Sequence, residues 1–232
     1  VANDTPAAKA SAANPVAQRL APAHKAGNFG TGAQTQLNSY ADPRFAAKQV
    51  IALHVGVGDA DGVRTALANC LRGLSNSGAK TVLVSAHGLA LEAKASQERN
   101  WAHALVGAVE QGTYLYTTSK ADTVGKPFAA KITIGTDKAA ALSGEFAVAK
   151  AVASGVGVAK EWANRPANMA TPTHLGDQAK AMGKLKNMQV QVMGPREVAK
   201  LKMGSFMSVA QGSKEPLRFI VMQYKGAAAS QA

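Results

Sequence analysis

The strongest chemical pattern in the chain is HVGVGDADG, in which Gly56, Gly58 and Gly62 follow an apolar run. Glycines in this setting let the backbone approach a phosphate at the start of a helix. The spacing G-x-G-x-x-x-G is, however, one residue out of step with the dinucleotide-binding fingerprint. The carboxylates of Asp59 and Asp61 would also repel an anion. We interpret the stretch as a tight turn from a strand to a helix, and a phosphate site is the less favoured alternative.

The five histidines and the single cysteine form no recognisable catalytic or metal-binding pattern. The sequences H-E-x-x-H, C-x-x-C and G-x-S-x-G do not occur, so the common signatures of zinc sites and serine hydrolases are missing. His54 and His87 lie near predicted strand ends, where a site could form, but such residues more often bond a loop carbonyl. Cys70 has apolar neighbours and is expected to pack in a core, and a lone cysteine makes the cytosol the default compartment. The histidines are His24, His54, His87, His103 and His174.

The sequence NRPANMATPTHL combines two amides and two prolines directly after an alanine-rich stretch. Pro166 and Pro172 disfavour helix at the residue that precedes each of them. Asn164 and Asn168 can end a helix by bonding local backbone groups. Thr171 can cap a new helix whose first residue is proline. The composition predicts a rigid elbow between two structural units.

Predicted strands and helices alternate in the first half of the chain. An apolar strand is followed by a helix, with Asp59 or Asp61 as the expected N-cap. This alternation predicts an α/β domain with a largely parallel sheet. The predicted strands lie in residues 30–44, 50–57, 80–86 and 128–135, and the predicted helices in residues 63–74 and 96–116.

A long helix is predicted over residues 139–163, between two α/β patterns. Ser143 could cap its N-terminus. Gly155 and Gly157 each cost roughly 1 kcal/mol of helix propensity relative to alanine. We therefore expect this helix to pack closely against another part of the protein. Its apolar stripe is Phe146, Ala149, Val152, Val156 and Ala163.

The alternation resumes after the elbow. A helix beginning at Pro172 has Leu175, Ala179 and Met182 on its apolar face. A strand, a short helix ended by Gly204, and a second strand follow. These three elements are predicted at residues 188–193, 196–203 and 217–224.

Charge and composition limit the classes of partner. The net charge is +12, from 26 Lys and Arg against 14 Asp and Glu, and it is spread along the chain. This balance favours contact with a polyanion such as DNA without specifying one. Aromatic residues make up 5% of the chain, which argues against a stacking platform for single-stranded nucleic acid. No uninterrupted apolar run has the length of a membrane span, so no membrane partner is expected.

The segment AKEWANRPANMATPTHLGDQAKAM resembles the opening of the catalytic domain in leucyl aminopeptidases, the cytosol aminopeptidase or bacterial aminopeptidase A family. The likeness is strong over residues 142–226, including Met203-Gly204 and Tyr224. It is weaker but collinear over residues 34–141. The family pattern is Asn-x-Pro-x-Asn followed by Thr-Pro-x-x-Leu, met here by Asn164, Pro166, Asn168, Thr171, Pro172 and Leu175.

The resemblance implies a three-part organisation. Residues 1–138 would form an N-terminal macro-like α/β domain with a mostly parallel sheet, and residues 139–163 a linker helix. Residues 164–232 would form the start of an α/β catalytic domain, which is incomplete relative to the family. The elbow formed by Asn164, Pro166, Asn168, Thr171 and Pro172 would join these parts in a structural role.

The resemblance also implies a two-metal exopeptidase that removes N-terminal residues from peptides, acting as a cytoplasmic homohexamer. The two divalent ions, manganese or zinc, are bound in the family by carboxylates and one lysine in segments beyond the position of Ala232. No residue of this chain therefore inherits a catalytic, cofactor-binding or metal-binding role, and Lys225 is not assigned one. The chain alone is expected to bind no metal and to have no peptidase activity.

Two alternatives belong to other functional classes. Bacterial members of the family resemble proteins that also bind DNA, so the basic chain could have a regulatory DNA-binding role without catalysis. The macro-like half could instead bind a nucleotide or ADP-ribose, which only the likeness of fold suggests.

Overall fold

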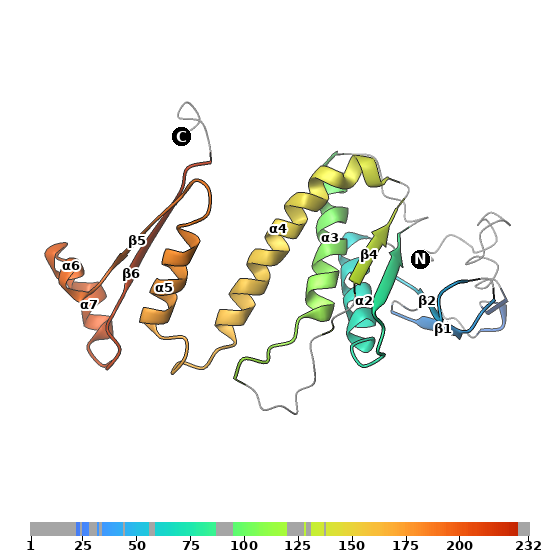
Figure 1. Cartoon of the computed structure of the whole chain (residues 1–232), viewed down its shortest axis with the longest axis horizontal. Helices are drawn as coiled ribbons and strands as arrows, with labels where there is room; N and C mark the ends of the chain where they lie inside the picture. Colours follow the sequence, from blue (N-terminus) through green and yellow to red (C-terminus); the bar gives the residue numbers. More distant parts are fainter. Residues whose placement is uncertain are drawn as a thin grey trace. The chain divides into compact units, whose positions relative to one another are not determined.

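The structure is a computed structural model, and its first 159 and last 73 residues form separate compact units, Val1–Ala159 and Lys160–Ala232. Each unit is described by itself (Figure 1). The residues that the structure describes are 22–23, 25–27, 32, 34–43, 45–55, 59–86, 95–119, 128, 131–136 and 138–226.

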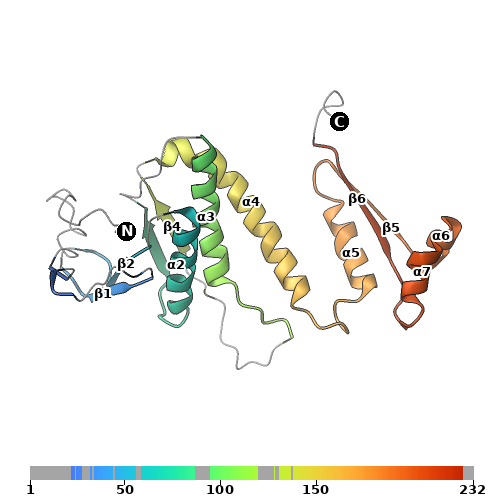
Figure 2. The same ribbon diagram turned by 180° about the vertical axis from the view of Figure 1, so that it is seen from behind.

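The first unit contains two strand pairs and two helices that pack against each other. The pair β1–β2 is antiparallel, with Leu37 opposite Ala52, whereas β3–β4 is parallel, with Leu83 opposite Thr133. The helices α2 and α3 lie side by side in both ribbon views (Figures 1 and 2). The bounds are β1 Gln36–Tyr40, β2 Gln49–Leu53, α2 Ala60–Gly73, β3 Thr81–Ser85, α3 Ala95–Thr113 and β4 Lys131–Gly135.

Most of these elements were predicted from the sequence. The helix α3 ends at Thr113, so Leu115 lies beyond the helix in which the periodicity placed it. In β3 and β4 the residues Val82, Val84, Ile132 and Ile134 pack against the core. The intervening Leu83 is 71% exposed, because alternate side chains of a strand point to opposite faces.

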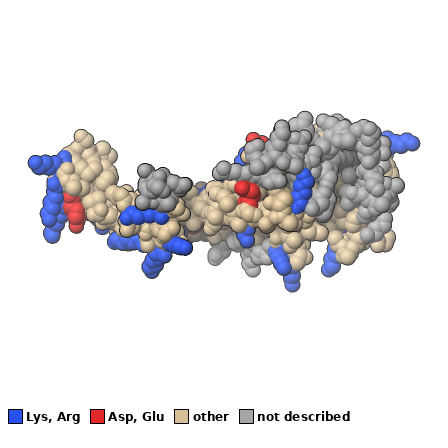
Figure 3. Space-filling view, turned by 90° about the horizontal axis from the view of Figure 1, so that it is seen from above, with Lys and Arg blue, Asp and Glu red and all other residues tan. Residues whose placement is uncertain are grey.

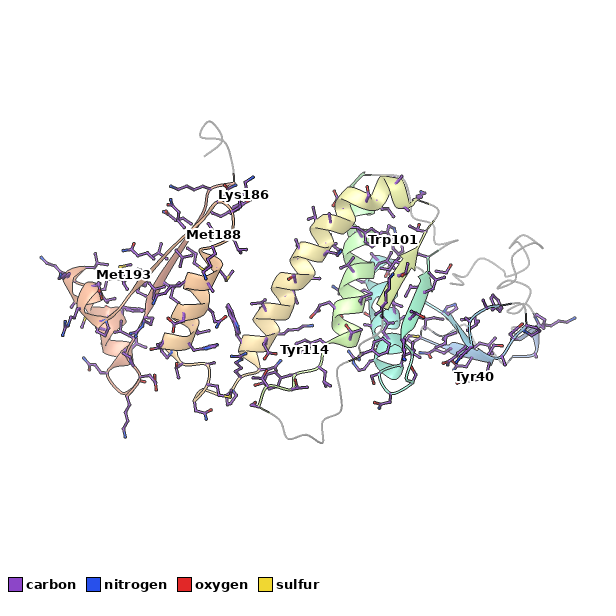
Figure 4. The ribbon with its side chains drawn as sticks, in the orientation of Figure 1. Tyr40, Trp101, Tyr114, Lys186, Met188 and Met193 are labelled. Carbon is purple, nitrogen blue, oxygen red and sulfur yellow. The ribbon has the colours of Figure 1, made fainter. Side chains whose placement is uncertain are left out.

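The core of the first unit lies where α2, α3 and the strands meet. Gly112 of α3 allows the close approach of α2, because a Cβ added there would lie 2.7 Å from the carbonyl oxygen of Ala68. Cys70 is buried in this core, as expected, and burial raises the pKa of its thiol. The fully buried members of the core are small or aliphatic, and Trp101 is its largest residue (Figure 4). The core consists of Leu53, Val55, Val63, Ala66, Leu67, Ala68, Cys70, Leu71, Ala86, Trp101, Leu105, Ala108 and Leu142.

The helix α2 begins at the acidic cap that the sequence predicted. The Asp59 carboxylate accepts a hydrogen bond from the backbone N–H of Gly62, at 2.6 Å. Asp61 instead forms an exposed ion pair with Arg64, at 3.1 Å. Of the two candidate residues, Asp59 is therefore the N-cap of α2.

We expect Asp59→Ala to lower the free energy of unfolding by about 1 kcal/mol, because an orphan N–H of the first turn loses its acceptor. Urea unfolding followed by circular dichroism measures the change. Asp59→Asn, which keeps an acceptor, should retain most of the stability. Asp61→Ala is the matched control, and an equal loss in both alanine variants would contradict the assignment of the cap.

The long helix α4 spans Ala139–Ala163, the same residues as the predicted linker helix. Leu142 and Ala149 are its buried residues, and Phe146 packs partly against the core. Ser143 does not cap the helix, because α4 starts four residues earlier and the Ser143 hydroxyl donates to the carbonyl oxygen of Ala140, at 2.9 Å.

The predicted close packing along α4 is wrong for the described residues. A Cβ added to Gly155 or Gly157 would meet no atom within 4 Å. Val152 and Val156 of the predicted apolar stripe are 48% and 41% exposed. The expected tight contact was inferred from the cost of helix glycines, but here these glycines lie at an open surface.

By length and composition alone, α4 also qualifies as a helix able to cross a membrane. The sequence contains no uninterrupted apolar run over this helix, because Lys150 interrupts it. Core helices of soluble proteins meet the same criterion, so this is weak support for a membrane span.

The second unit is an antiparallel strand pair with three helices. In the register of β5 and β6, Met188 lies opposite Tyr224 and Met193 opposite Phe219. Met188 and Met193 mark the two ends of β5 in Figure 4. The bounds are α5 Pro172–Met182, β5 Met188–Met193, α6 Pro195–Lys200, α7 Gly204–Ala210 and β6 Phe219–Tyr224.

Two further features distinguish the second unit. The helix α6 ends at Lys200, so Gly204 does not end it as the sequence predicted, and Gly204 begins the helix α7 instead. All seven methionines of the chain lie in this unit, among them Met193, which is buried, and Met222, which is 41% exposed.

Candidate functional site at the elbow

The elbow follows the end of α4, within the second unit. The N–H of Asn164 donates to the carbonyl oxygen of Lys160 at 3.0 Å and continues the helical pattern for one residue. Pro166 then starts a separate turn, since the N–H groups of Met169 and Ala170 both donate to its carbonyl oxygen, at 2.9 and 3.0 Å. The predicted elbow residues Asn164, Pro166 and Asn168 lie on the exposed side of this turn.

The start of α5 is fixed by the other two elbow residues. The backbone N–H of His174 donates to the Thr171 hydroxyl oxygen at 3.2 Å, so Thr171 is the N-cap, as predicted. Pro172 occupies the first helical position, where its missing N–H needs no partner. The elbow is thus a short turn between two helix ends, each closed by backbone hydrogen bonds.

Arg165 connects the two sides of the elbow. Its Nη2 donates to Oε1 of Glu161 near the end of α4, at 3.4 Å. Its Nη1 lies 3.1 Å from Nε2 of His174 in the first turn of α5. The Arg165 side chain is 20% exposed, and its Nε is buried without a partner among the described residues. A largely dehydrated guanidinium therefore contacts both helices that the elbow separates.

The helix α5 packs against the strand pair through a small residue. A Cβ added to Gly176 would lie 3.0 Å from Cγ1 of Val192 and 3.5 Å from Cγ of Arg218. The Arg218 guanidinium donates to the carbonyl oxygen of Leu217 at 2.9 Å. The close approach at Gly176 lets α5, which follows the elbow, pack against β5 and β6.

The helices α6 and α7 complete the unit. The backbone N–H of Gly194 donates to Oε2 of Glu197 at 3.0 Å. The pKa of Glu197 is lowered by hydrogen bonds from the backbone N–H groups of Glu197 itself and of Gly194. Since the folded-state pKa is the lower one, this contribution to stability is present above pH 4.5 and is lost as the pH falls below that value. Phe206 and Phe219 pack edge to face with ring centroids 5.4 Å apart, joining α7 to β6.

The other sequence candidates form no site in the part of the chain that the structure describes. Gly56 and Gly58 lie outside the described residues, and so do His24 and His87. At the start of α2, the Asp59 carboxylate accepts the hydrogen bond from the backbone N–H of Gly62 that a bound phosphate would otherwise accept. This contact supports the interpretation of the stretch as a turn and not as a phosphate site. Of the described histidines, His54 follows β2, His103 lies in α3 and His174 lies in α5. No described group of His, Cys, Asp or Glu could hold a metal ion.

Among the described residues visible in Figure 3, the basic side chains do not collect into one site either. Figure 3 shows Lys and Arg on the surface of both parts of the chain, with few Asp or Glu between them. This distribution agrees with the spread of charge along the sequence.

Sequence reasoning missed Arg165 and His174 as partners. Their types gave no signal, because an arginine before a proline and a histidine in a first helical turn are both ordinary surface residues. The predicted cap at Thr171 and the turn at Pro166 were the only indications that the two positions lie close together.

Relatives in sequence assign the second unit to a family. The sequence model for the catalytic domain of the cytosol aminopeptidase family matches residues 157–232. A probable cytosol aminopeptidase of Polaromonas sp. (strain JS666) is 40% identical over 217 residues, which cover 94% of this chain and 42% of the relative. A second, from Acidovorax sp. (strain JS42), is 46% identical over 197 residues, covering 84% and 38%. The chain therefore spans about two fifths of the length of these relatives.

Solved structures show the same fold. A variant of tomato leucine aminopeptidase matches 93% of this chain and 44% of its own, with a TM-score of 0.72 and 21% identity. The bottromycin maturation enzyme BotP in complex with Mn matches 88% of this chain and 42% of its own, with a TM-score of 0.69 and 22% identity. These likenesses confirm the predicted α/β class, and the sequence relatives give the assignment. The chain belongs to the cytosol aminopeptidase family.

Proposed function

We propose that this chain is part of a metal-dependent aminopeptidase that releases N-terminal residues from peptides. The match of residues 157–232 to the catalytic domain of the cytosol aminopeptidase family carries the proposal. The elbow residues support the proposal, because Thr171 and Pro172, which belong to the family pattern, form the N-cap and the first position of α5.

The metals of the proposed enzyme are two divalent ions, manganese or zinc. BotP, which shares the fold, has been solved in complex with Mn. The described residues of this chain do not fit such a centre, because they contain no suitable group of ligands. The family implies carboxylate and lysine ligands for these ions, and we propose none of the described residues as a ligand.

The role that we propose for the chain is organisation of the enzyme. Residues 1–138 form a macro-like domain, residues 139–163 a linker helix and residues 164–232 the start of the catalytic domain. The elbow, Arg165 included, orients the first helix of the catalytic domain relative to the end of the linker. We further propose a cytoplasmic homo-oligomer, with a hexamer as the expected state. The basic charge is the only feature that favours DNA as a partner, and DNA binding is not part of this proposal.

A chimera tests the proposal directly. Residues 34–226 replace the matching segment of the Polaromonas relative, and hydrolysis of a leucyl chromogenic substrate is measured with Mn²⁺ or Zn²⁺. We expect metal-dependent turnover that a chelator abolishes. A folded chimera without such turnover, beside an active parent enzyme, would contradict the proposal. The chain by itself, assayed in the same way, should give no turnover above a metal-free blank.

A further inference from the structure

The contact between Arg165 and His174 fixes the protonation state of the imidazole. A guanidinium has five N–H donors and no acceptor, so it must donate to the Nε2 atom that lies 3.1 Å from its Nη1. Only an imidazole that is unprotonated at Nε2 can accept this bond. His174 is therefore neutral in this arrangement, with its proton on Nδ1.

We propose that the Glu161–Arg165–His174 contact is a proton-sensitive joint, closed while His174 is neutral and opened when His174 takes up a proton. An imidazolium has no free lone pair and is a donor at both nitrogens. Protonation would thus replace the hydrogen bond by two cations that face each other at about 3 Å, where like charges repel. Of its side-chain partners among the described residues, Arg165 would then keep Glu161, on the α4 side of the elbow.

Because Arg165 is largely buried, its guanidinium needs hydrogen-bond acceptors from the protein. Arg165 is largely buried and its Nε has no partner among the described residues, so loss of the imidazole leaves another donor without an acceptor. The bond joins residues on opposite sides of Pro166, so its loss removes one contact between the first turn of α5 and the elbow at the end of α4.

The strands β5 and β6, against which α5 packs, carry no charged residue. Asp177, the nearest carboxylate along α5, is paired with Lys180 at 3.3 Å. The charged groups from all the elements around His174 are Lys160 and Glu161 of α4, Arg165 of the elbow, Asp177 and Lys180 of α5, and Arg218 before β6.

Amide hydrogen exchange of the full chain tests the joint. Peptides covering residues 161–175 are followed by mass spectrometry at about pH 5.5 and about pH 8, with rates corrected for the intrinsic effect of pH. We expect protection in this segment to be about threefold weaker at the lower pH, the effect of losing one hydrogen bond. Peptides of α2 serve as the internal reference and should not change.

Two variants assign the effect to the joint. His174→Gln keeps an acceptor that does not titrate, so the pH dependence should disappear. Arg165→Gln removes the guanidinium, so protection should be weak at both pH values. The other four histidines are unchanged in both variants. If His174→Gln keeps the pH dependence of the unmodified chain, or if the unmodified chain shows none, the proposal is wrong.

A measurement without any substitution is also decisive. Nitrogen-15 spectra of the labelled histidine rings distinguish the two neutral tautomers and the charged form. At about pH 8 we expect the ring of His174 to carry its proton on Nδ1, with Nε2 as an acceptor. A proton on Nε2 at that pH would overturn the proposal, whether or not the variants fold.

Discussion

Replacing Gly112 by alanine should lower the free energy of unfolding of the first unit by about 1–3 kcal/mol. A Cβ at this position would lie 2.7 Å from the carbonyl oxygen of Ala68 and 2.8 Å from Cβ of Leu71. Neither atom can move without shifting the backbone of α2, so the two helices must separate. The roughly 0.5–1 kcal/mol that alanine gains over glycine in a helix does not offset this overlap.

Gly107 provides the matched control on the same helix. A Cβ there would have only Cδ of Arg64 at 3.7 Å, an ordinary contact. Gly107→Ala should therefore raise stability by about 0.5–1 kcal/mol through helix propensity alone. Urea unfolding of both variants in a Trp162→Phe background, with fluorescence of Trp101 as the probe, gives the two values. Equal effects at the two positions would show that α2 and α3 are not in close contact at Gly112.

Leu142→Ala should destabilise the first unit by about 2–5 kcal/mol, the range for removing a buried leucine side chain. Leu142 is fully buried and belongs to the same core as Leu71 and Leu105. Apart from Ala149 and the partly buried Phe146, little of α4 is buried with it. The variant should therefore both leave a cavity and weaken the attachment of the first turns of α4.

Val148→Ala tests the same helix at a surface position. Val148 is 48% exposed, and its truncation should change stability by no more than about 0.5 kcal/mol. Leu142→Met, which conserves most of the volume, should recover much of the loss seen in Leu142→Ala. The same fluorescence assay applies, and a loss for Val148→Ala as large as for Leu142→Ala would argue against the described packing of α4.

Local signals in the sequence predicted the elements better than their contacts. Asp59 and Thr171 were identifiable as caps because capping needs only one side-chain acceptor and the next few N–H groups. The antiparallel pairing of β1 with β2 was not foreseen, since alternation with helices says little about which strands become neighbours. Gly155 and Gly157 misled the prediction, because a glycine costs the same helix propensity at an open surface as at a tight contact.

At the candidate site, the elbow was predictable from the sequence, but its side-chain contacts were not. The prolines and amides between Asn164 and Pro172 restrict the backbone locally, so their composition was enough to predict a turn. The bond between Arg165 and His174 depends on where the chain returns after that turn. The distance between the Arg165 and His174 side chains depends on the three-dimensional course of the backbone, which the spacing of residues along the sequence does not determine.

All seven methionines lie in the second unit, so the two units differ in their sensitivity to methionine oxidation. Thioethers are readily converted to polar sulfoxides, and those near solvent react first. Mild peroxide would therefore modify Met169 and Met222 at the surface before the buried Met193, while the first unit offers no thioether at all. Methionine oxidation would therefore be confined to the unit that matches the catalytic domain.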